Sequence, residues 1–165
     1  MALTKLTKHI VHGATIVQVR FKDLGDFSFN NTSVNDAGNI TITPQYADSI
    51  LEIHYTASVA TPTNNDSANT DLYLDVNGTD EYTLDGVNDP GNFTYSFNSH
   101  GREDGSSVNA YHRHLPGTTN LQTVTVQYQK NSTNGGTTQV REQFICVKEI
   151  AGGLTTGTPG NAYVN

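Results

Sequence analysis

The chain has 165 residues and a formal net charge of −7, from nine Lys and Arg against sixteen Asp and Glu. Only 15% of the residues are charged, whereas Thr, Asn, Gly and Ser together fill 65 of the 165 positions. A single cysteine excludes an intrachain disulfide, and the missing basic stripe and long apolar run speak against nucleic-acid binding and membrane insertion.

The first thirteen residues predict a short N-terminal arm. Leu3, Leu6 and Ile10 recur at roughly the spacing of one helix face. A helix of this length is marginal alone and needs a surface to dock against. We therefore expect residues 1–13 to be a docking arm, with no secretory leader before it.

From residue 14 onward the apolar residues have a period of two, which indicates half-buried strands. In the first run, Val17, Val19 and Phe21 share one side and Gln18 and Arg20 the other. The same alternation recurs at 39–43, 49–59, 71–76, 93–97, 123–129 and 139–150. In the last of these runs we expect Cys146 to be a small core residue.

Turn residues separate these runs at short intervals, as in Asn77-Gly78 and Leu115-Pro116-Gly117. About eight strands in one chain of this length predict an all-β fold, an antiparallel β-sandwich of the jelly-roll type. We expect residues 14–150 to form this domain and residues 151–165 to be a flexible Gly/Thr-rich tail.

No catalytic motif stands out, since the sequence lacks a nucleophile elbow, a zinc-protease helix and a phosphate-binding glycine loop. We therefore expect a protein that is not an enzyme and that needs no cofactor.

Two stretches offer metal-binding chemistry. His112 and His114 would share one side of a strand, and a pair from each of three chains could hold a metal near a threefold axis. The alternative is that both are ordinary solvated strand residues. Residues 75–81 resemble a cation loop with oxygen ligands around a glycine turn, and a plain hairpin explains them equally.

Recognition of a glycan by outer loops would draw on Tyr82, Asp89, Asn92 and Tyr111. Trp, which sugar platforms favour, is absent from the chain.

Three segments resemble one family in their order and spacing. They are ITITPQYADSILEIHYTASV at 40–59, HLPGTTNLQTVTVQYQ at 114–129, and FICVKEI at 144–150 followed by Gly152-Gly153. They are similar to motifs of bacteriophage virion proteins of the tail-fibre-like type. Where that family often has an aspartate before Pro-Gly, this chain has Leu115.

The resemblance implies a jelly roll that assembles as a homotrimer, similar to the tumour-necrosis-factor-like modules on phage particles. It implies a capsid decoration protein (a cement or head-fibre protein) on the virion surface, assembled in the host cytoplasm and bound to the major capsid protein. The alternative is a receptor-binding tail-fibre tip, held by a tail adaptor, that recognises a host surface glycan. A free carbohydrate-binding lectin is a third interpretation.

Overall fold

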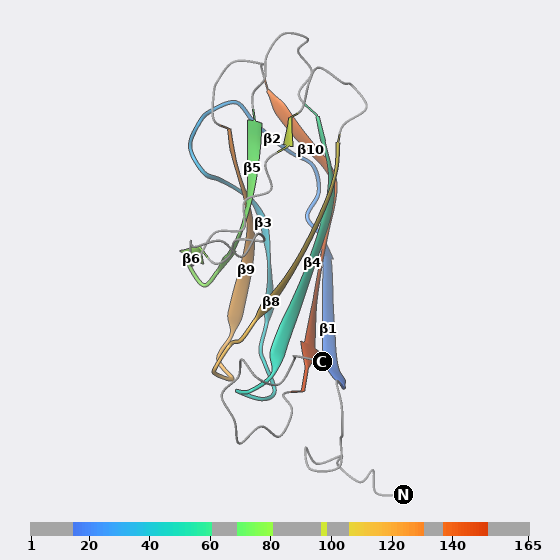
Figure 1. Cartoon of the computed structure of the whole chain (residues 1–165), viewed down its shortest axis with the longest axis vertical. Coiled ribbons are helices and arrows are strands. Elements are labelled where there is room, and N and C mark those ends of the chain that lie inside the picture. The colour runs from blue at the N-terminus through green and yellow to red at the C-terminus, as the bar shows by residue number, and fades with distance from the viewer. Residues whose placement is uncertain (1–14, 61–68, 81–96, 99–105, 131–136, 152–165) are drawn as a thin grey trace, which may run out of the picture.

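The computed structural model describes residues 15–60, 69–80, 97–98, 106–130 and 137–151, and these residues form strands and turns (Figure 1). The strands are β1 (Ile16–Asp23), β2 (Phe27–Phe29), β3 (Asn35–Ile42), β4 (Ile50–Ala60), β5 (Asn69–Val76), β6 (Thr79–Asp80), β7 (Phe97–Asn98), β8 (Ser106–His114), β9 (Gln122–Lys130) and β10 (Thr138–Ile150). None of the described residues forms a helix long and apolar enough to cross a membrane.

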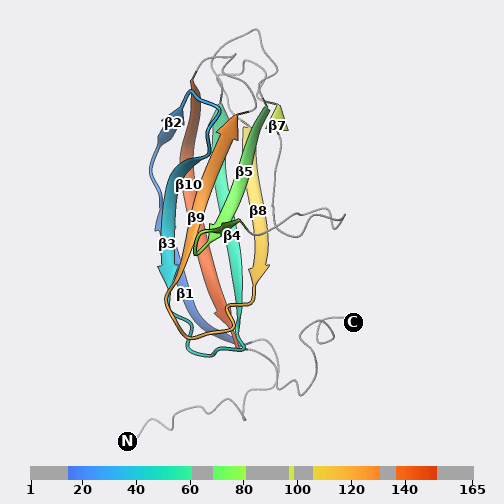
Figure 2. The same ribbon diagram turned by 90° about the vertical axis from the view of Figure 1, so that its left-hand side faces the viewer.

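The strands make two antiparallel sheets that lie face to face (Figures 1 and 2). Sheet A has the order β1-β10-β4-β8, with β2 paired to β10. Sheet B has the order β3-β9-β5-β6, with β7 paired to β5. The chain crosses between the sheets from β2 to β3, from β3 to β4, from β4 to β5, from β7 to β8, from β8 to β9 and from β9 to β10. This is the connectivity of a jelly roll, so the predicted fold class is confirmed.

The core lies between the sheets and is built by every second residue of the long strands. On β4, Leu51, Ile53, Tyr55 and Val59 are fully buried and Ala57 is buried with them, while Glu52, His54, Thr56 and Ser58 point outward. The same alternation buries Leu72, Leu74 and Val76 on β5, Val124, Val126 and Tyr128 on β9, and Ile145 and Val147 on β10. Burial of apolar surface at about 25 cal/mol per Å² makes this layer the main source of stability.

A polar chain of hydrogen bonds crosses the core. The Tyr55 hydroxyl donates to Gln143 Oε1 at 2.8 Å and lies 2.8 Å from the Tyr128 hydroxyl of the opposite sheet. Because Tyr55 has one proton to give, Tyr128 donates to Tyr55. Gln143 Nε2 in turn donates to the carbonyl of Gly25 at 2.7 Å. The network therefore ties both sheets and the β1–β2 connection together.

Gln143 reaches the core because β10 is interrupted there. The pairing of β10 with β4 breaks between Arg141 and Phe144, and Glu142 adopts a left-handed φ of 53°. The bulge turns the Gln143 side chain inward, where it is fully buried. It also sets the alternation of the rest of β10, so that Phe144, Cys146 and Lys148 point outward.

A buried carboxylate fixes the connection between β3 and β4. Glu149 Oε1 accepts hydrogen bonds from the backbone N–H groups of Gln45 and Tyr46, at 2.8 and 3.1 Å. Its other oxygen accepts from Gln18 Nε2 at 2.6 Å. Gln18 also donates to the carbonyl of Thr43. This end of the sandwich is thereby closed by side-chain to backbone bonds.

Candidate functional site

Strand β1 presents its apolar side to solvent. Phe21 pairs with Cys146 and Val19 pairs with Lys148, both on the outward side of β10. Phe21 is 70% exposed and Val19 is also exposed. A register shift between Ile16 and Gln18 takes Val17 out of the alternation, so the expectation that Val17, Val19 and Phe21 form one half-buried side is wrong.

The polar side of β1 faces sheet B instead. Gln18 bonds to Glu149 and Thr43, and Lys22 Nζ donates to the carbonyl of Asn39 on β3 at 2.9 Å. These long side chains reach from the edge of sheet A to the edge of sheet B. They hold the sandwich edge closed, and this is the physical reason for the reversed orientation.

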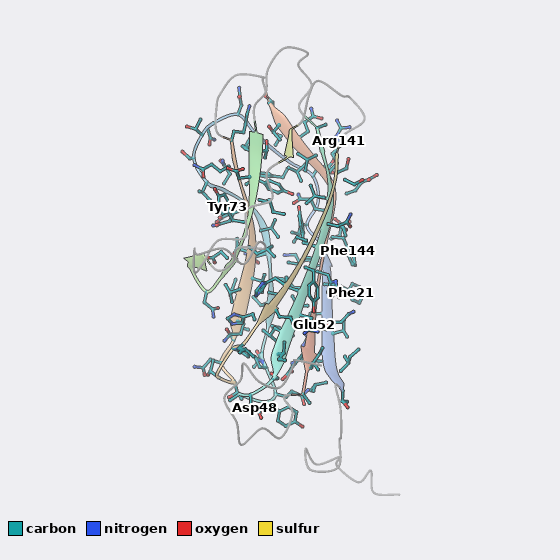
Figure 3. All side chains as sticks on the ribbon, viewed as in Figure 1. Phe21, Asp48, Glu52, Tyr73, Arg141 and Phe144 are labelled. Carbon is teal, nitrogen blue, oxygen red and sulfur yellow. The ribbon has the colours of Figure 1, made fainter. Side chains whose placement is uncertain are left out.

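The exposed apolar side chains of β1 and β10 lie on the outer face of sheet A. The rings of Phe21 and Phe144 stack with their centroids 6.0 Å apart, and Phe144 is 43% exposed (Figure 3). Ile16, which pairs with the outward-facing Ile150, is exposed at the end of the same strand. We call Ile16, Val19, Phe21 and Phe144 the apolar strip.

Next to the apolar strip lies a polar network on β4 and β8. Glu52 Oε1 accepts from the Tyr111 hydroxyl at 2.8 Å and from Arg113 Nη2 at 2.8 Å. Arg113 Nε also donates to the Tyr111 hydroxyl at 2.6 Å. Burial alone raises the pKa of Glu52, but the bonds from Tyr111 and Arg113 outweigh it and hold the pKa below its usual value. The carboxylate is therefore charged and neutralised within the face.

His54 lies between the apolar strip and the polar network. It pairs with Cys146 on one side and with Tyr111 on the other. The imidazole meets the Tyr111 ring edge-on, with centroids 4.7 Å apart. Burial and the nearby charge of Lys148 lower the pKa of His54 against the opposing effect of Glu52.

Cys146 belongs to this outer face and not to the core. It pairs with Phe21 and His54 and is half-buried, whereas its neighbours Ile145 and Val147 point inward and are fully buried. The expectation of a core cysteine is wrong, because the bulge at Glu142 sets which side of β10 faces sheet B.

The outer faces of the two sheets differ in chemistry. Eight large hydrophobic side chains are exposed among the described residues, and five lie on strands of sheet A, namely Ile16, Val19, Phe21, Tyr111 and Phe144. None lies on a described strand of sheet B. There the outward side chains bond to one another, as when Gln127 Nε2 donates to Asp36 and Tyr73 donates to Gln129. Figure 3 shows Tyr73 and the Phe21–Phe144 pair on opposite outer sides of the sandwich.

His112 and His114 share one side of β8, and that side faces the space between the sheets. They pair with Ile53 and Leu51, whose side chains are fully buried in the core. Burial, together with the neighbouring His114, lowers the pKa of His112 to about 4. No three His, Cys, Asp or Glu side chains within the described ranges come together to hold a metal.

The stretch beginning at Asp75 is a hairpin turn in the part that is described. Asn77 and Gly78 both have left-handed φ values, 59° and 78°, as a two-residue hairpin requires. Asp75 Oδ1 accepts from the Gly78 N–H at 2.9 Å, and Asn77 bonds to Thr123 and Gln122. These oxygens serve the turn, which favours the hairpin over the cation loop.

The remaining candidates are only partly placed. Tyr111 lies within β8 and is 39% exposed, with its hydroxyl in the polar network. Tyr82, Asp89 and Asn92 lie outside the described residues, and so do Leu3, Leu6 and Ile10 of the arm and all of the tail after residue 151.

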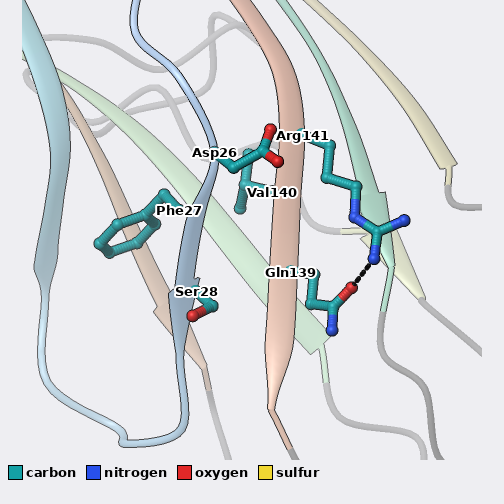
Figure 4. Close-up of a pocket in the computed structure, with 6 residues that line it drawn as sticks. All are labelled: Asp26, Phe27, Ser28, Gln139, Val140 and Arg141. Atoms are coloured by element: carbon teal, nitrogen blue, oxygen red, sulfur yellow. Dashed lines mark hydrogen bonds between the residues drawn. The ribbon is translucent and has the colours of Figure 1, made fainter.

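Among the described residues, shallow hollows open beside β10 at two places. One of about 230 Å³ lies beside the β2–β10 ladder and is lined by Asp26, Phe27, Ser28, Gln139, Val140 and Arg141, with Arg141 donating to Gln139 (Figure 4). The other, of about 400 Å³, lies by the bulge and is lined by Thr56, Ala57, Ser58, Ser107, Val108, Asn109 and Glu142. Neither lining pairs a nucleophile with a histidine base.

Comparison with known proteins gives only distant likenesses. No family model and no curated protein matches the chain. Among solved structures, dimeric latent PorU from Porphyromonas gingivalis is 12% identical with a TM-score of 0.49, over 85% of this chain and 14% of that one. The infectious bursal disease virus VP2 subviral particle is 10% identical with a TM-score of 0.44, over 91% of this chain and 43% of that one. The chain thus spans less than half the length of either protein.

Proposed function

We propose that this protein is a structural component of a bacteriophage particle, a homotrimer that decorates the outside of the capsid. The observation that carries the proposal is the apolar strip, a set of large hydrophobic side chains exposed on the outer face of sheet A. The resemblance of three sequence segments to phage virion proteins supports a place in a phage particle. The activity is binding, without catalysis or a cofactor.

The strip favours contact with another protein surface. Phe21 and Phe144 point away from the core and are 70% and 43% exposed. Large contiguous apolar patches on a sheet are rarely left in water, and aromatic side chains are enriched at protein interfaces. Covering the strip recovers about 25 cal/mol for each Å² removed from water.

We propose that a second copy of the chain covers the outer face of sheet A. The polar network leaves the Tyr111 ring as exposed apolar surface and neutralises Glu52 with Arg113. Glu52 can therefore be covered without being left as an unpaired charge. Since the two halves of the face differ, one copy's apolar strip would lie on the next copy's polar network. Such head-to-tail contacts make a closed ring when successive copies are related by a rotation that closes, and a threefold rotation would give the proposed trimer.

Attachment to the particle is assigned to the arm formed by Leu3, Leu6 and Ile10. The major capsid protein is its proposed partner, and a tail adaptor is the alternative. The polar outer face of sheet B would then face solvent, which suits a protein displayed on a virion surface.

Light scattering of the purified chain, followed by cosedimentation with undecorated phage heads, tests this function. We expect a mass of three chains and a pellet that contains both components. A trimer that ignores heads and binds host cells would move the role to a tail-fibre tip. A monomer that binds only polysaccharide would favour the lectin interpretation.

Two variants locate the contact. Phe21→Ser combined with Phe144→Ser should abolish the trimer and leave the fold intact. Tyr73→Ser removes an aromatic side chain from the outer face of sheet B and should leave the trimer unchanged. Equal effects of both would contradict the assignment to sheet A.

A further inference from the structure

The outer face of sheet A contains one group suited to respond to mild acid. His54 occupies the centre of that face, between the apolar strip and the polar network. Its Nε2 atom is buried and has no hydrogen-bond partner among the described residues. A neutral imidazole tolerates such a position far better than a charged one.

The groups around His54 add to this preference for the neutral form. On its own strand it faces Glu52, whose charge is already taken up by Arg113 and Tyr111. On β10 it faces the thiol of Cys146 and the ammonium of Lys148, and on β8 the Tyr111 ring and Arg113. On β1, Phe21 lies beyond Cys146, as the register partner of that residue. Two cations and an aromatic row therefore surround it, with a single carboxylate that is already paired.

We propose that His54 makes the self-association of this face sensitive to acid, so that the assembly holds at neutral pH and weakens as the imidazole takes up a proton. This inference rests on the proposed function, because it concerns the same surface. A neighbouring copy that covers His54 with its apolar strip removes the remaining water from the ring. Each His54 must then be neutral before it is covered, so assembly releases protons at acid pH.

The direction of the effect follows from linkage. The pKa of His54 in the free chain is already below the usual 6.5, first through burial and then through Lys148. Contact with a neighbouring copy lowers the pKa of His54 further. The assembled chain therefore binds fewer protons than the free chain below about pH 6.5. The association constant then falls by up to about tenfold per pH unit for each His54 that is covered.

The experiment is sedimentation velocity on the whole chain between pH 7.5 and 4.5, with circular dichroism at each pH to show that the fold persists. We expect a trimer at pH 7.5 that dissociates towards pH 4.5. The variant His54→Gln, which cannot be charged, should remain assembled across the range. His112→Gln is the matched control, because His112 faces the space between the sheets, and it should still dissociate in acid.

Each outcome bears on the inference. A trimer that is equally strong at both pH values would overturn the acid sensitivity and leave the proposed function standing. Dissociation that persists in His54→Gln would overturn the assignment to His54. A monomer at every pH would overturn both the inference and the proposed function.

Discussion

Phe21 and Phe144 stack across neighbouring strands although they are not register partners. Phe21 pairs with Cys146, and Phe144 pairs with Asp23, so the two rings meet on a diagonal with their centroids 6.0 Å apart. Diagonal contacts of this kind lie within reach of aromatic side chains on a sheet. The contact joins an edge strand to the strand beside it, on the outside of the molecule.

This ring pair should contribute little to the stability of the separate chain. We expect a double-mutant cycle of Phe21→Ala and Phe144→Ala to give a coupling of about 0.5 kcal/mol, at the low end for aromatic pairs because both rings are exposed. Urea unfolding at a concentration where the chain is monomeric measures it. A coupling of several kcal/mol would mean that the rings serve the fold and not a partner.

The hydrogen-bonded chain of Tyr55, Tyr128 and Gln143 should be costly to cut in the middle. Tyr55→Phe removes the donor to Gln143 Oε1 and the acceptor for Tyr128, so we expect a loss of roughly 2–3 kcal/mol of unfolding free energy. Tyr128→Phe leaves the Tyr55–Gln143 bond in place and should cost about 1 kcal/mol. Equilibrium urea denaturation compares the two, and an equal cost would contradict the order of donors given above.

Glu142 should be a site at which glycine stabilises the protein. Its φ of 53° is uncommon for a residue with a side chain and natural for glycine. We expect Glu142→Gly to raise the unfolding free energy by about 0.5–1 kcal/mol. Glu142→Ala keeps the strain and is the control, since it should not stabilise. The midpoint of thermal unfolding reports both.

Loss of the Glu149 carboxylate should free the connection between β3 and β4. Glu149→Ala leaves the N–H groups of Gln45 and Tyr46 without their acceptor, and we expect a cost of roughly 2–3 kcal/mol. Amide hydrogen exchange at these two residues should accelerate in the variant. Unchanged exchange at Gln45 and Tyr46 would show that the carboxylate does not hold this segment.

His112 should make the fold sensitive to acid independently of assembly. Its pKa is about 4 in the folded chain, against about 6.5 when unfolded, so the unfolded chain binds more protons between these values. Stability is therefore full above pH 6.5, falls as the pH drops towards 4, and is constant below. Because His112 is partly open to water, we expect about 1–2 kcal/mol over this interval. The urea concentration at the midpoint of unfolding should fall from pH 7 to pH 4 in the unmodified chain. It should fall less over the same range in His112→Gln.

The sandwich could be predicted from the sequence because its central strands alternate without interruption. On β4, β5 and β9 both neighbours are paired and one side must face the core, so the apolar set on β4, for example Ile53 and Val59, fixes which side that is. The spacing of His112 and His114 likewise shows that they share a side. It does not show that this side faces between the sheets.

The candidate site escaped prediction for two physical reasons. Alternation shows which residues of β1 share a side, but at a sheet edge the long polar side chains of Gln18 and Lys22 can close the sandwich and leave Phe21 outside. On β10 three consecutive polar residues, 141–143, give no sign of which one turns inward. The bulge that buries Gln143 also decides the side on which Cys146 lies. A run of polar residues inside a strand pattern is the signal that could have marked the bulge.

The position of β10 constrains the order in which the molecule can fold. This strand is late in the chain, yet it pairs with β1, β2 and β4, three of the other four strands of sheet A. In the folded sheet β10 lies between β1 and β4, so neither strand has this neighbour until β10 has paired. Contacts so distant in sequence make folding slow and leave strand edges open in the meantime. Sheet A is therefore expected to form late in folding, once β10 can pair with β1, β2 and β4.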